Sequence, residues 1–191
     1  MALTAEELNK FWDMAEMLRN NVDPGEYKHI VLGLVFLKHV SDSFDERRNE
    51  LLAKFNDTSS DAYKPNEQAK QNALESRDYY TEVNVFWVPE GSRWSSIAQN
   101  ARQSDIAMRI DEALYQIERE NPKLEGILER SYANSRLPAA TLGSVVDMIS
   151  TIDFKNSKGK AEDVLGQVYE YFLGKFSSEE GKKAGAFYTA P

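Results

Sequence analysis

The sequence predicts a mainly α-helical fold, a multi-helix bundle with one small β element. Apolar residues recur at helical spacing over most of the chain, and helix-start signals precede the first two apolar stretches. Only one short β element is predicted, because only one short segment combines aromatic and β-branched residues. The chain has 191 residues, of which 41% are hydrophobic and 28% charged, so it has the composition of a folded protein and can bury a sizeable core.

Capping signals open the first two predicted helices. Thr4 and Glu7 form a capping-box pattern, in which each side chain reaches the other's backbone N–H, and this helix should end near Asn20. Asp23-Pro24 is the second signal, with aspartate as the cap and proline at the first helical position. The second helix should run to about Phe55. Its first half is apolar on nearly every side, which predicts the enclosed, central element of the bundle.

The middle of the chain contains the predicted β element. Residues 56–66 are rich in Asp, Ser, Asn and Pro and predict a loop, and a polar helix should follow over about 66–80. Residues 83–88, Val-Asn-Val-Phe-Trp-Val, predict a strand that a turn at residues 89–91 ends. The aromatic residues Phe86, Trp87 and Trp94 are interpreted as core, with a role as partner contacts as the alternative.

Further helices are predicted in the second half of the chain. Ser92 should cap a short helix, and Ser104 should begin a longer one that Asn121-Pro122 stops. Three more helical segments are expected, with a polar, lysine-bearing loop over 151–160 before the last of them: residues 124–128, 142–149 and about 163–176.

Several kinds of catalytic site are excluded by composition and spacing. The chain has no Cys, so it has neither disulfides nor thiolate metal sites. His29 and His39 are interpreted as structural, and no metal site is expected. Glycines never occur as Gly-x-Gly, which removes phosphate-binding turns of the dinucleotide type. Prolines are never adjacent, so the Asn-Pro-Pro-Tyr motif, which holds the flipped base in amino methyltransferases, is absent as well.

The absence of Cys indicates a cytoplasmic protein, and the sequence predicts neither a signal peptide nor a membrane segment. The N-terminal residues are acidic rather than basic, unlike a signal peptide, and the longest apolar run, residues 30–37, is far below the ~20 residues that span a bilayer. The net charge of −8 argues against strong nonspecific nucleic-acid binding by this chain alone. The lysines between residues 155 and 183 are interpreted as a solvated linker, with contacts to DNA phosphates as the alternative.

Four segments, in order, resemble the modification (methyltransferase) subunit of type I DNA restriction-modification systems. The first combines residues 11–19 and 26–42 of the first two predicted helices. The second is Asn84-Val85-Phe86-Trp87-Val88-Pro89 with Arg93-Trp94, and the third is residues 163–173. The fourth is Gly185-Ala186-Phe187-Tyr188-Thr189, which is similar to the opening motif of an N6-adenine DNA methyltransferase domain.

The resemblance implies that an N-terminal helical domain precedes an α/β S-adenosylmethionine-dependent methyltransferase domain. By the same resemblance, Phe187, Tyr188 and Thr189 would contact S-adenosylmethionine. Ala190 separates Thr189 from Pro191, where the family has Thr-Pro. The catalytic residues and the other walls of the cofactor pocket are expected beyond residue 191, so this chain alone should neither bind the cofactor nor methylate DNA.

The resemblance also implies partners and a division into domains. A full-length subunit would methylate adenine at N6 in double-stranded DNA together with a specificity subunit and a second modification subunit, with a restriction subunit as a further candidate. Residues 1–160 would form the helical domain, 161–178 a connecting helix, and 179–191 a linker with the first methyltransferase motif. The alternative is a stand-alone helical protein–protein interaction module that uses a helix face.

Overall fold

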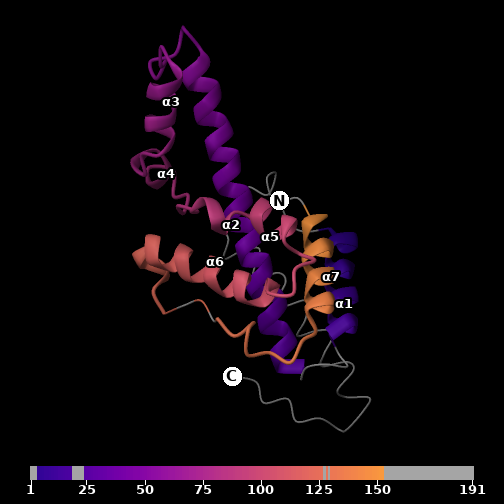
Figure 1. Ribbon diagram of the computed structural model, residues 1–191. Coiled ribbons are helices and arrows are strands. Elements are labelled where there is room, and N and C mark those ends of the chain that lie inside the picture. The colour runs from indigo at the N-terminus through magenta and orange to yellow at the C-terminus, as the bar shows by residue number, and fades with distance from the viewer. Residues whose placement is uncertain (1–3, 19–23, 127, 129, 153–191) are drawn as a thin grey trace.

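The described part of the protein is helical. The computed structural model describes residues 4–18, 24–126, 128 and 130–152, and within these ranges no residue lies in a β-strand (Figure 1). The expectation of a mainly α fold is therefore confirmed. The helices, in chain order, are α1 (Ala5–Leu18), α2 (Pro24–Asn56), α3 (Glu67–Leu74), α4 (Asp78–Thr81), the 3-10 turn η1 (Glu90–Ser92), α5 (Trp94–Gln99), α6 (Ile106–Glu120), the 3-10 turn η2 (Pro122–Leu124) and α7 (Ala139–Ser150).

The first two helices begin where the capping signals place them. The backbone N–H of Thr4 donates to Glu7 Oε2 over 2.8 Å, and the N–H of Glu7 donates to Thr4 Oγ1 over 3.1 Å. This pair is the predicted capping box. Pro24 is the first residue of α2, as predicted, whereas the proposed cap Asp23 lies outside the described residues. α1 ends at Leu18, two residues before the expected end.

The first half of α2 is the centre of the bundle. α1, α5 and α7 all pack against α2, and α1 also packs along α7 (Figure 1). Ile30, Leu34 and Leu37 are at most 1% exposed, because helices cover this part of α2 on several sides. The prediction of an enclosed central helix is confirmed.

The second half of α2 leaves the bundle and forms an arm with α3 and α4 (Figure 1). A helix of 33 residues is about 50 Å long at the usual rise of ~1.5 Å per residue, which is long enough to serve both the bundle and the arm. The arm has an aromatic centre, in which the rings of Phe44 and Tyr80 stack with their centroids 4.9 Å apart. The polar helix expected over 66–80 is divided into α3 and α4, and Asn66 caps the first by accepting from the N–H of Ala69.

The predicted strand at residues 83–88 is wrong. Residues 85–89 have no regular secondary structure, and Asn84 has a φ of 58°. The side chain of Asn121 takes the place of a neighbouring strand: its Oδ1 accepts from the N–H of Trp87 over 3.0 Å, and its Nδ2 donates to the carbonyl of Trp87 over 2.9 Å. Because one amide satisfies both backbone groups, the aromatic segment is buried without a sheet.

Three predicted helix boundaries also differ from the structure. The Ser92 hydroxyl donates to the carbonyl of Ala113 over 3.0 Å instead of capping α5, which begins after Arg93 without a side-chain cap. α6 begins at Ile106, two residues after the predicted start at Ser104. In place of the helical turn expected at 124–128, the structure has η2, which begins two residues earlier and ends four residues earlier. The loop beyond residue 152 and the helix expected over 163–176 lie outside the described residues.

Candidate interaction site of the helical domain

The residues predicted to touch a cofactor lie outside the part of the chain that the structure describes. These are Phe187, Tyr188 and Thr189, and the lysines from residue 155 to residue 183 lie outside it as well. The described residues therefore provide the helical framework that leads toward them. The last described residue, Ile152, is 1% exposed and follows directly on the end of α7.

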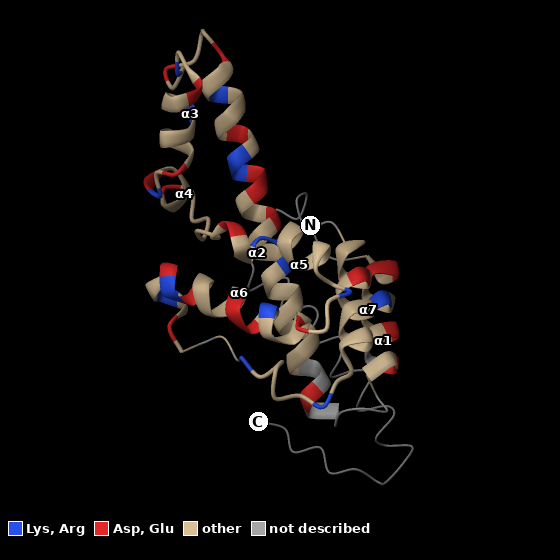
Figure 2. Cartoon of the chain, viewed as in Figure 1, with Lys and Arg blue, Asp and Glu red and all other residues tan. Residues whose placement is uncertain are grey.

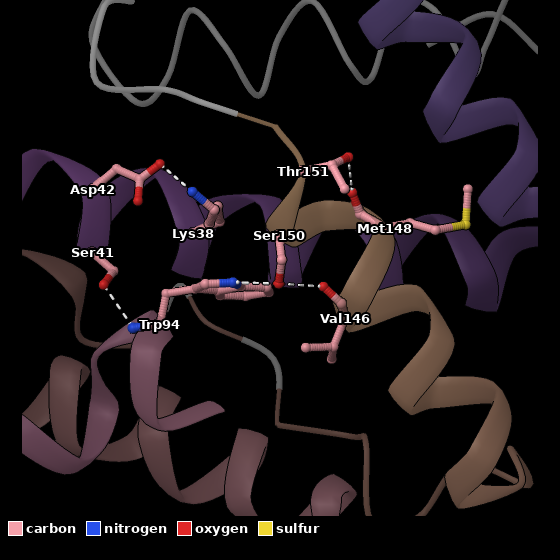
Figure 3. Close-up of polar contacts among 8 residues, drawn as sticks. All are labelled: Lys38, Ser41, Asp42, Trp94, Val146, Met148, Ser150 and Thr151. Atoms are coloured by element: carbon pink, nitrogen blue, oxygen red, sulfur yellow. Dashed lines mark hydrogen bonds and ion pairs between the residues drawn. The ribbon is translucent and has the colours of Figure 1, made fainter. Parts of the chain in front are cut away.

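A polar junction fixes the end of α7 to α2 and α5 (Figure 3). The backbone N–H of Trp94 donates to Ser41 Oγ over 2.7 Å, and its indole Nε1–H donates to Ser150 Oγ over 2.8 Å. The Ser150 hydroxyl in turn donates to the carbonyl of Val146 over 2.8 Å. Trp94 is 6% exposed, so both of its N–H groups are buried and both have acceptors. The junction holds three helices in one relative position.

Two lysines add charge close to this junction. Lys38 and Asp42 form an ion pair one helical turn apart on α2, with less than a tenth of either side chain exposed (Figure 3). Lys10 of α1 donates to Thr151 Oγ1 over 3.2 Å. The desolvation cost of such a buried pair offsets much of its Coulomb attraction, so the pair adds little net stability. The described side chains of this cluster hold α2, α5 and α7 in place. They provide hydroxyls and a paired charge but no activated nucleophile.

A second group of contacts fixes residues 130–135 against α6 and α2. The carboxylate of Asp111 accepts from the backbone N–H groups of Tyr132 and Ala133 over 3.1 and 2.9 Å. The Tyr132 hydroxyl donates to the carbonyl of Ile30 over 2.6 Å, deep in the bundle. At Gly33 a Cβ would lie 2.3 Å from that hydroxyl, so the glycine provides the space for the tyrosine.

A hollow of about 300 Å³ lies beside these contacts on the outer face of α6. It is an open depression, lined by side chains of α6 and of the segment that follows η2. The guanidinium of Arg130 lies 4.9 Å from the centre of the Tyr115 ring and 3.8 Å from Glu118 Oε1. The lining residues are Met108, Asp111, Glu112, Tyr115, Arg130 and Ala133.

A buried arginine side chain joins the helices of the arm to one another. Arg47 on α2 is 6% exposed, and its Nε–H donates to the carbonyl of Tyr79 over 2.9 Å. Its NH2 group lies 2.8 Å from Glu82 Oε1, which ties α2 to the end of α4. Arg48 faces Glu75 at 3.7 Å. Arg47 and Arg48 thus face partners within the arm, and acidic and basic residues alternate along it (Figure 2).

The pKa values of Tyr80 and Asp57 are shifted in the folded protein. Burial raises the pKa of the Tyr80 hydroxyl above its ordinary value of 10.0, and this hydroxyl donates to the carbonyl of Leu74 over 2.8 Å. Hydrogen bonds from the hydroxyl and then the N–H of Ser59 lower the pKa of the exposed Asp57. Both groups belong to the arm, and neither adjoins the junction or the hollow. Within the described ranges, no cluster of three or more His, Asp or Glu side chains could hold a metal ion.

The burial of the aromatic side chains decides whether they are core residues or partner contacts. Trp87 and Trp94 are buried and Phe86 is partly buried, so their interpretation as core residues is confirmed. The roles of Ser41, Ser150 and Asn121 in these hydrogen bonds were not predicted from the sequence. Only Asn121 carried a local signal, since it precedes a proline at a helix end. No helix among the described residues is long and apolar enough to span a bilayer.

Family models match two successive segments of the chain. The model of the HsdM N-terminal domain matches residues 8–149, which is most of the chain and most of the described bundle. The model of N-6 DNA methylases matches residues 160–191. The second match covers the segment that contains the predicted cofactor residues.

Known proteins with similar sequences are methylase subunits. The chain is 34% identical over 188 residues to the methylase subunit of the type I restriction enzyme MjaIX from Methanocaldococcus jannaschii, which covers 98% of this chain and 34% of that protein. It is 30% identical over 121 residues to the methylase subunit of the type I restriction enzyme HindI from Haemophilus influenzae, covering 53% of this chain and 27% of that protein. The chain thus spans about a third or less of the length of these curated relatives.

A solved structure has the same fold. The crystal structure of a type I restriction-modification system methyltransferase subunit from Streptococcus thermophilus superposes with a TM-score of 0.66 at 24% sequence identity. The similarity covers 97% of this chain and 41% of that one. Together with the family match over residues 8–149, these findings confirm the resemblance seen in the sequence: the chain belongs to the family of HsdM N-terminal domains, followed by the beginning of an N-6 DNA methylase segment.

Proposed function

We propose that this chain is the N-terminal part of the modification subunit of a type I restriction-modification system, a site-specific adenine-N6 DNA methyltransferase. The observation that carries the proposal is the order of the two family matches, with the HsdM N-terminal domain over 8–149 and the N-6 DNA methylase segment after it, over 160–191. In this proposal residues 1–160 form the helical domain, 161–178 a connecting helix, and 179–191 a linker with the first methyltransferase motif.

The cofactor of the complete subunit would be S-adenosylmethionine, which supplies the methyl group when bound. The described residues do not fit this cofactor by themselves, because the hollow on α6 carries two carboxylates and the sequence lacks a Gly-x-Gly turn. Phe187 and Tyr188 would provide apolar contacts to the cofactor, and Thr189 a hydroxyl or backbone contact. The catalytic motif is expected beyond residue 191, so the helical domain would act by docking and positioning.

The partners in this proposal are a specificity subunit, a second modification subunit and double-stranded DNA, with a restriction subunit as a further candidate. The net charge of −8 supports an assembly in which other parts provide most of the positive charge for DNA. The junction of Trp94, Ser41 and Ser150 supports a positional role, because it fixes the end of α7, the last described element before the methylase segment.

The experiment that tests the proposal begins by reading the gene beyond codon 191. A continuation with a glycine-rich loop after a strand and an Asn-Pro-Pro-Tyr or Asn-Pro-Pro-Phe motif is expected. The longer protein, purified with its specificity subunit, should transfer tritiated methyl groups from S-adenosylmethionine to adenine in DNA, and the chain of 191 residues should transfer none. By calorimetry only the longer protein should bind S-adenosylmethionine.

Two outcomes would contradict the proposal. One is methylation of DNA by the chain of 191 residues unaided. The other is a reading frame that ends at codon 191, together with the absence of cofactor binding. The second outcome would favour the alternative of a helical protein–protein interaction module.

A further inference from the structure

The C-terminal end of α7 is tied to three other helices. Lys10 of α1 donates to Thr151 Oγ1 over 3.2 Å, and Trp94 at the start of α5 donates through its indole Nε1–H to Ser150 Oγ over 2.8 Å (Figure 3). The backbone N–H of the same tryptophan donates to Ser41 on α2 over 2.7 Å. Two neighbouring residues at the end of α7 are thereby connected to α1, α2 and α5.

α7 is also fixed along its length. A Cβ at Gly143 would lie 2.2 Å from the carbonyl oxygen of Ala101, so at this point the helix lies directly against backbone at the end of α5. One turn further on, Asp147 lies 2.5 Å from the guanidinium of Arg102. That ion pair is exposed and adds little stability, but the backbone contact prevents α7 from moving closer to α5. The end of α7 therefore has one position relative to the bundle.

The match to the methylase family begins shortly after this end. It starts at residue 160, eight residues beyond Ile152, which is 1% exposed and follows α7. Eight residues reach at most about 29 Å even when fully extended. The position and direction of the end of α7 therefore limit where the methylase segment can begin.

The contact of Trp94 with Ser150 defines a direction more than it adds stability. The side chain of Trp94 is 6% exposed, and a phenylalanine ring would supply most of the same burial, whereas the indole N–H adds a directional contact. Ser150 is exposed, and its hydroxyl also donates to the carbonyl of Val146 over 2.8 Å. Water can replace the indole as the donor to this hydroxyl, so loss of the bond costs little free energy of folding.

We infer that Trp94 is a positioning residue for methyl transfer. Through Ser150 it sets the direction in which the chain leaves α7, and thereby the alignment of the methylase domain with the adenine to be methylated. The inference rests on the proposed function and adds the residue that couples the two parts of the subunit. Misplacement of reacting groups by ~1 Å can cost up to ~100-fold in rate, so the effect belongs in kcat. The cofactor pocket is expected in the methylase part, so the KM for S-adenosylmethionine should not change.

The test uses the full-length modification subunit in complex with its specificity subunit. Ser150→Ala removes the acceptor and should lower kcat for adenine methylation by roughly 10-fold, with the KM for S-adenosylmethionine within about two-fold of the wild type. Trp94→Phe keeps a buried ring without the indole N–H and should give a similar loss. Ser150→Thr keeps the hydroxyl and should retain the kcat of the wild type.

A matched control separates position from stability. Tyr80→Phe also removes one hydrogen bond, from the Tyr80 hydroxyl to the carbonyl of Leu74, but this bond is buried and lies in the arm, away from α7 (Figure 1). The control should lose at least as much stability as Ser150→Ala and should retain the kcat of the wild type. Thermal unfolding ranks the stabilities of the variants.

A distance measurement provides a readout that does not depend on turnover. The chain has no Cys, so Met17→Cys, at a position on α1 that is 43% exposed, offers a single site for a spin label. A second label is placed on an exposed side chain of the methylase domain, after any cysteines beyond residue 191 have been replaced by serine. Ser150→Ala should broaden the distance distribution roughly two-fold, since a contact that fixes one arrangement is lost. Ser150→Thr and Tyr80→Phe should leave it unchanged.

Three results would overturn the inference. The first is wild-type kcat and an unchanged distance distribution in both Ser150→Ala and Trp94→Phe. The second is an equal loss of kcat in the Tyr80→Phe control, which would assign the effect to stability. The third is a raised KM for S-adenosylmethionine with kcat unchanged. Absence of methylation by the wild-type complex would instead contradict the proposed function, and the distance distributions would still test the coupling.

Discussion

Asn121 has more structural consequence than its position between a helix and a proline suggests. Its amide makes three hydrogen bonds, two to the backbone of Trp87 and one from Nδ2 to the carbonyl of Ile117 over 2.7 Å. The residue is 9% exposed, so none of these groups can turn freely to water. One side chain thereby ends α6 and holds the segment that enters the core of the arm.

Asn121→Ala should destabilise the protein by about 2–4 kcal/mol, because the N–H and carbonyl of Trp87 would be left buried without partners. Asn100→Ala is the matched control, since Asn100 makes a single hydrogen bond to Ser96 and should cost less than about 1 kcal/mol. Urea unfolding followed by circular dichroism measures both. Equal losses in the two variants would show that the contacts to Trp87 contribute little.

The buried hydroxyl of Tyr80 should make the arm sensitive to alkaline pH. Burial raises the pKa of Tyr80 in the folded state above 10.0, so the unfolded chain loses this proton first as the pH rises. The stabilising contribution is complete below pH ~10 and is lost as the pH rises through the folded-state pKa.

Tyr80→Phe removes this titration together with the hydrogen bond to Leu74. At neutral pH the variant should be less stable than the wild type by about 0.5–1.5 kcal/mol. The difference should shrink as the pH rises above ~10, since only the wild type has the proton to lose at this site. Urea unfolding at pH 8, 10 and 11 would reveal a constant difference if burial of Tyr80 did not affect its ionisation.

At the scale of the elements, α7 packs against the end of α5 at unusually close range. A Cβ added to Gly143 would lie 2.2 Å from the carbonyl oxygen of Ala101. The obstacle is backbone, which cannot rotate away as a side chain can. Gly143 is therefore the residue that lets α7 approach α5 and reach the junction at Trp94.

Gly143→Ala should destabilise the protein by about 1–3 kcal/mol, although alanine is favoured over glycine by ~1 kcal/mol in an unconstrained helix. Gly91→Ala is the control, because nothing lies within 4 Å of a Cβ at that position, and it should be neutral or slightly stabilising. Thermal unfolding compares the two. A more stable Gly143→Ala protein would mean that α7 can shift away from α5 without loss.

The elements also show how far the sequence could predict this fold. Helix starts that depend on neighbouring residues, such as Thr4 with Glu7, were predictable because the partners lie within one turn. The segment at 83–88 was not, because its backbone partner is Asn121, 34 residues away from Trp87. The hollow on α6 depends in the same way on Asp111 holding residues 132 and 133, and no local pattern indicates that contact.

At the scale of the whole molecule, charge determines what the chain can bind alone. The net charge is −8, and several arginine side chains in the described part face carboxylates, among them Arg47, Arg77 and Arg102. Counterion release by phosphate contacts supplies most nonspecific DNA affinity, and it requires basic groups that are available to the phosphates. Such groups would have to come from a partner subunit or from the remainder of the methyltransferase.

The chain of 191 residues should therefore bind random-sequence duplex DNA at 150 mM salt more weakly than the ~1–100 µM range of typical nonspecific binders. Fluorescence anisotropy with a labelled 30-base-pair duplex measures this, with the complete complex as the positive control. Exchange of two exposed acids for lysine, Asp61→Lys with Glu125→Lys, should strengthen binding and steepen its salt dependence, because both changes reduce repulsion of the phosphates. Tight binding by the unmodified chain at 150 mM salt would contradict this expectation and favour the alternative that basic side chains of this chain, such as the lysines between residues 155 and 183, contact DNA phosphates themselves.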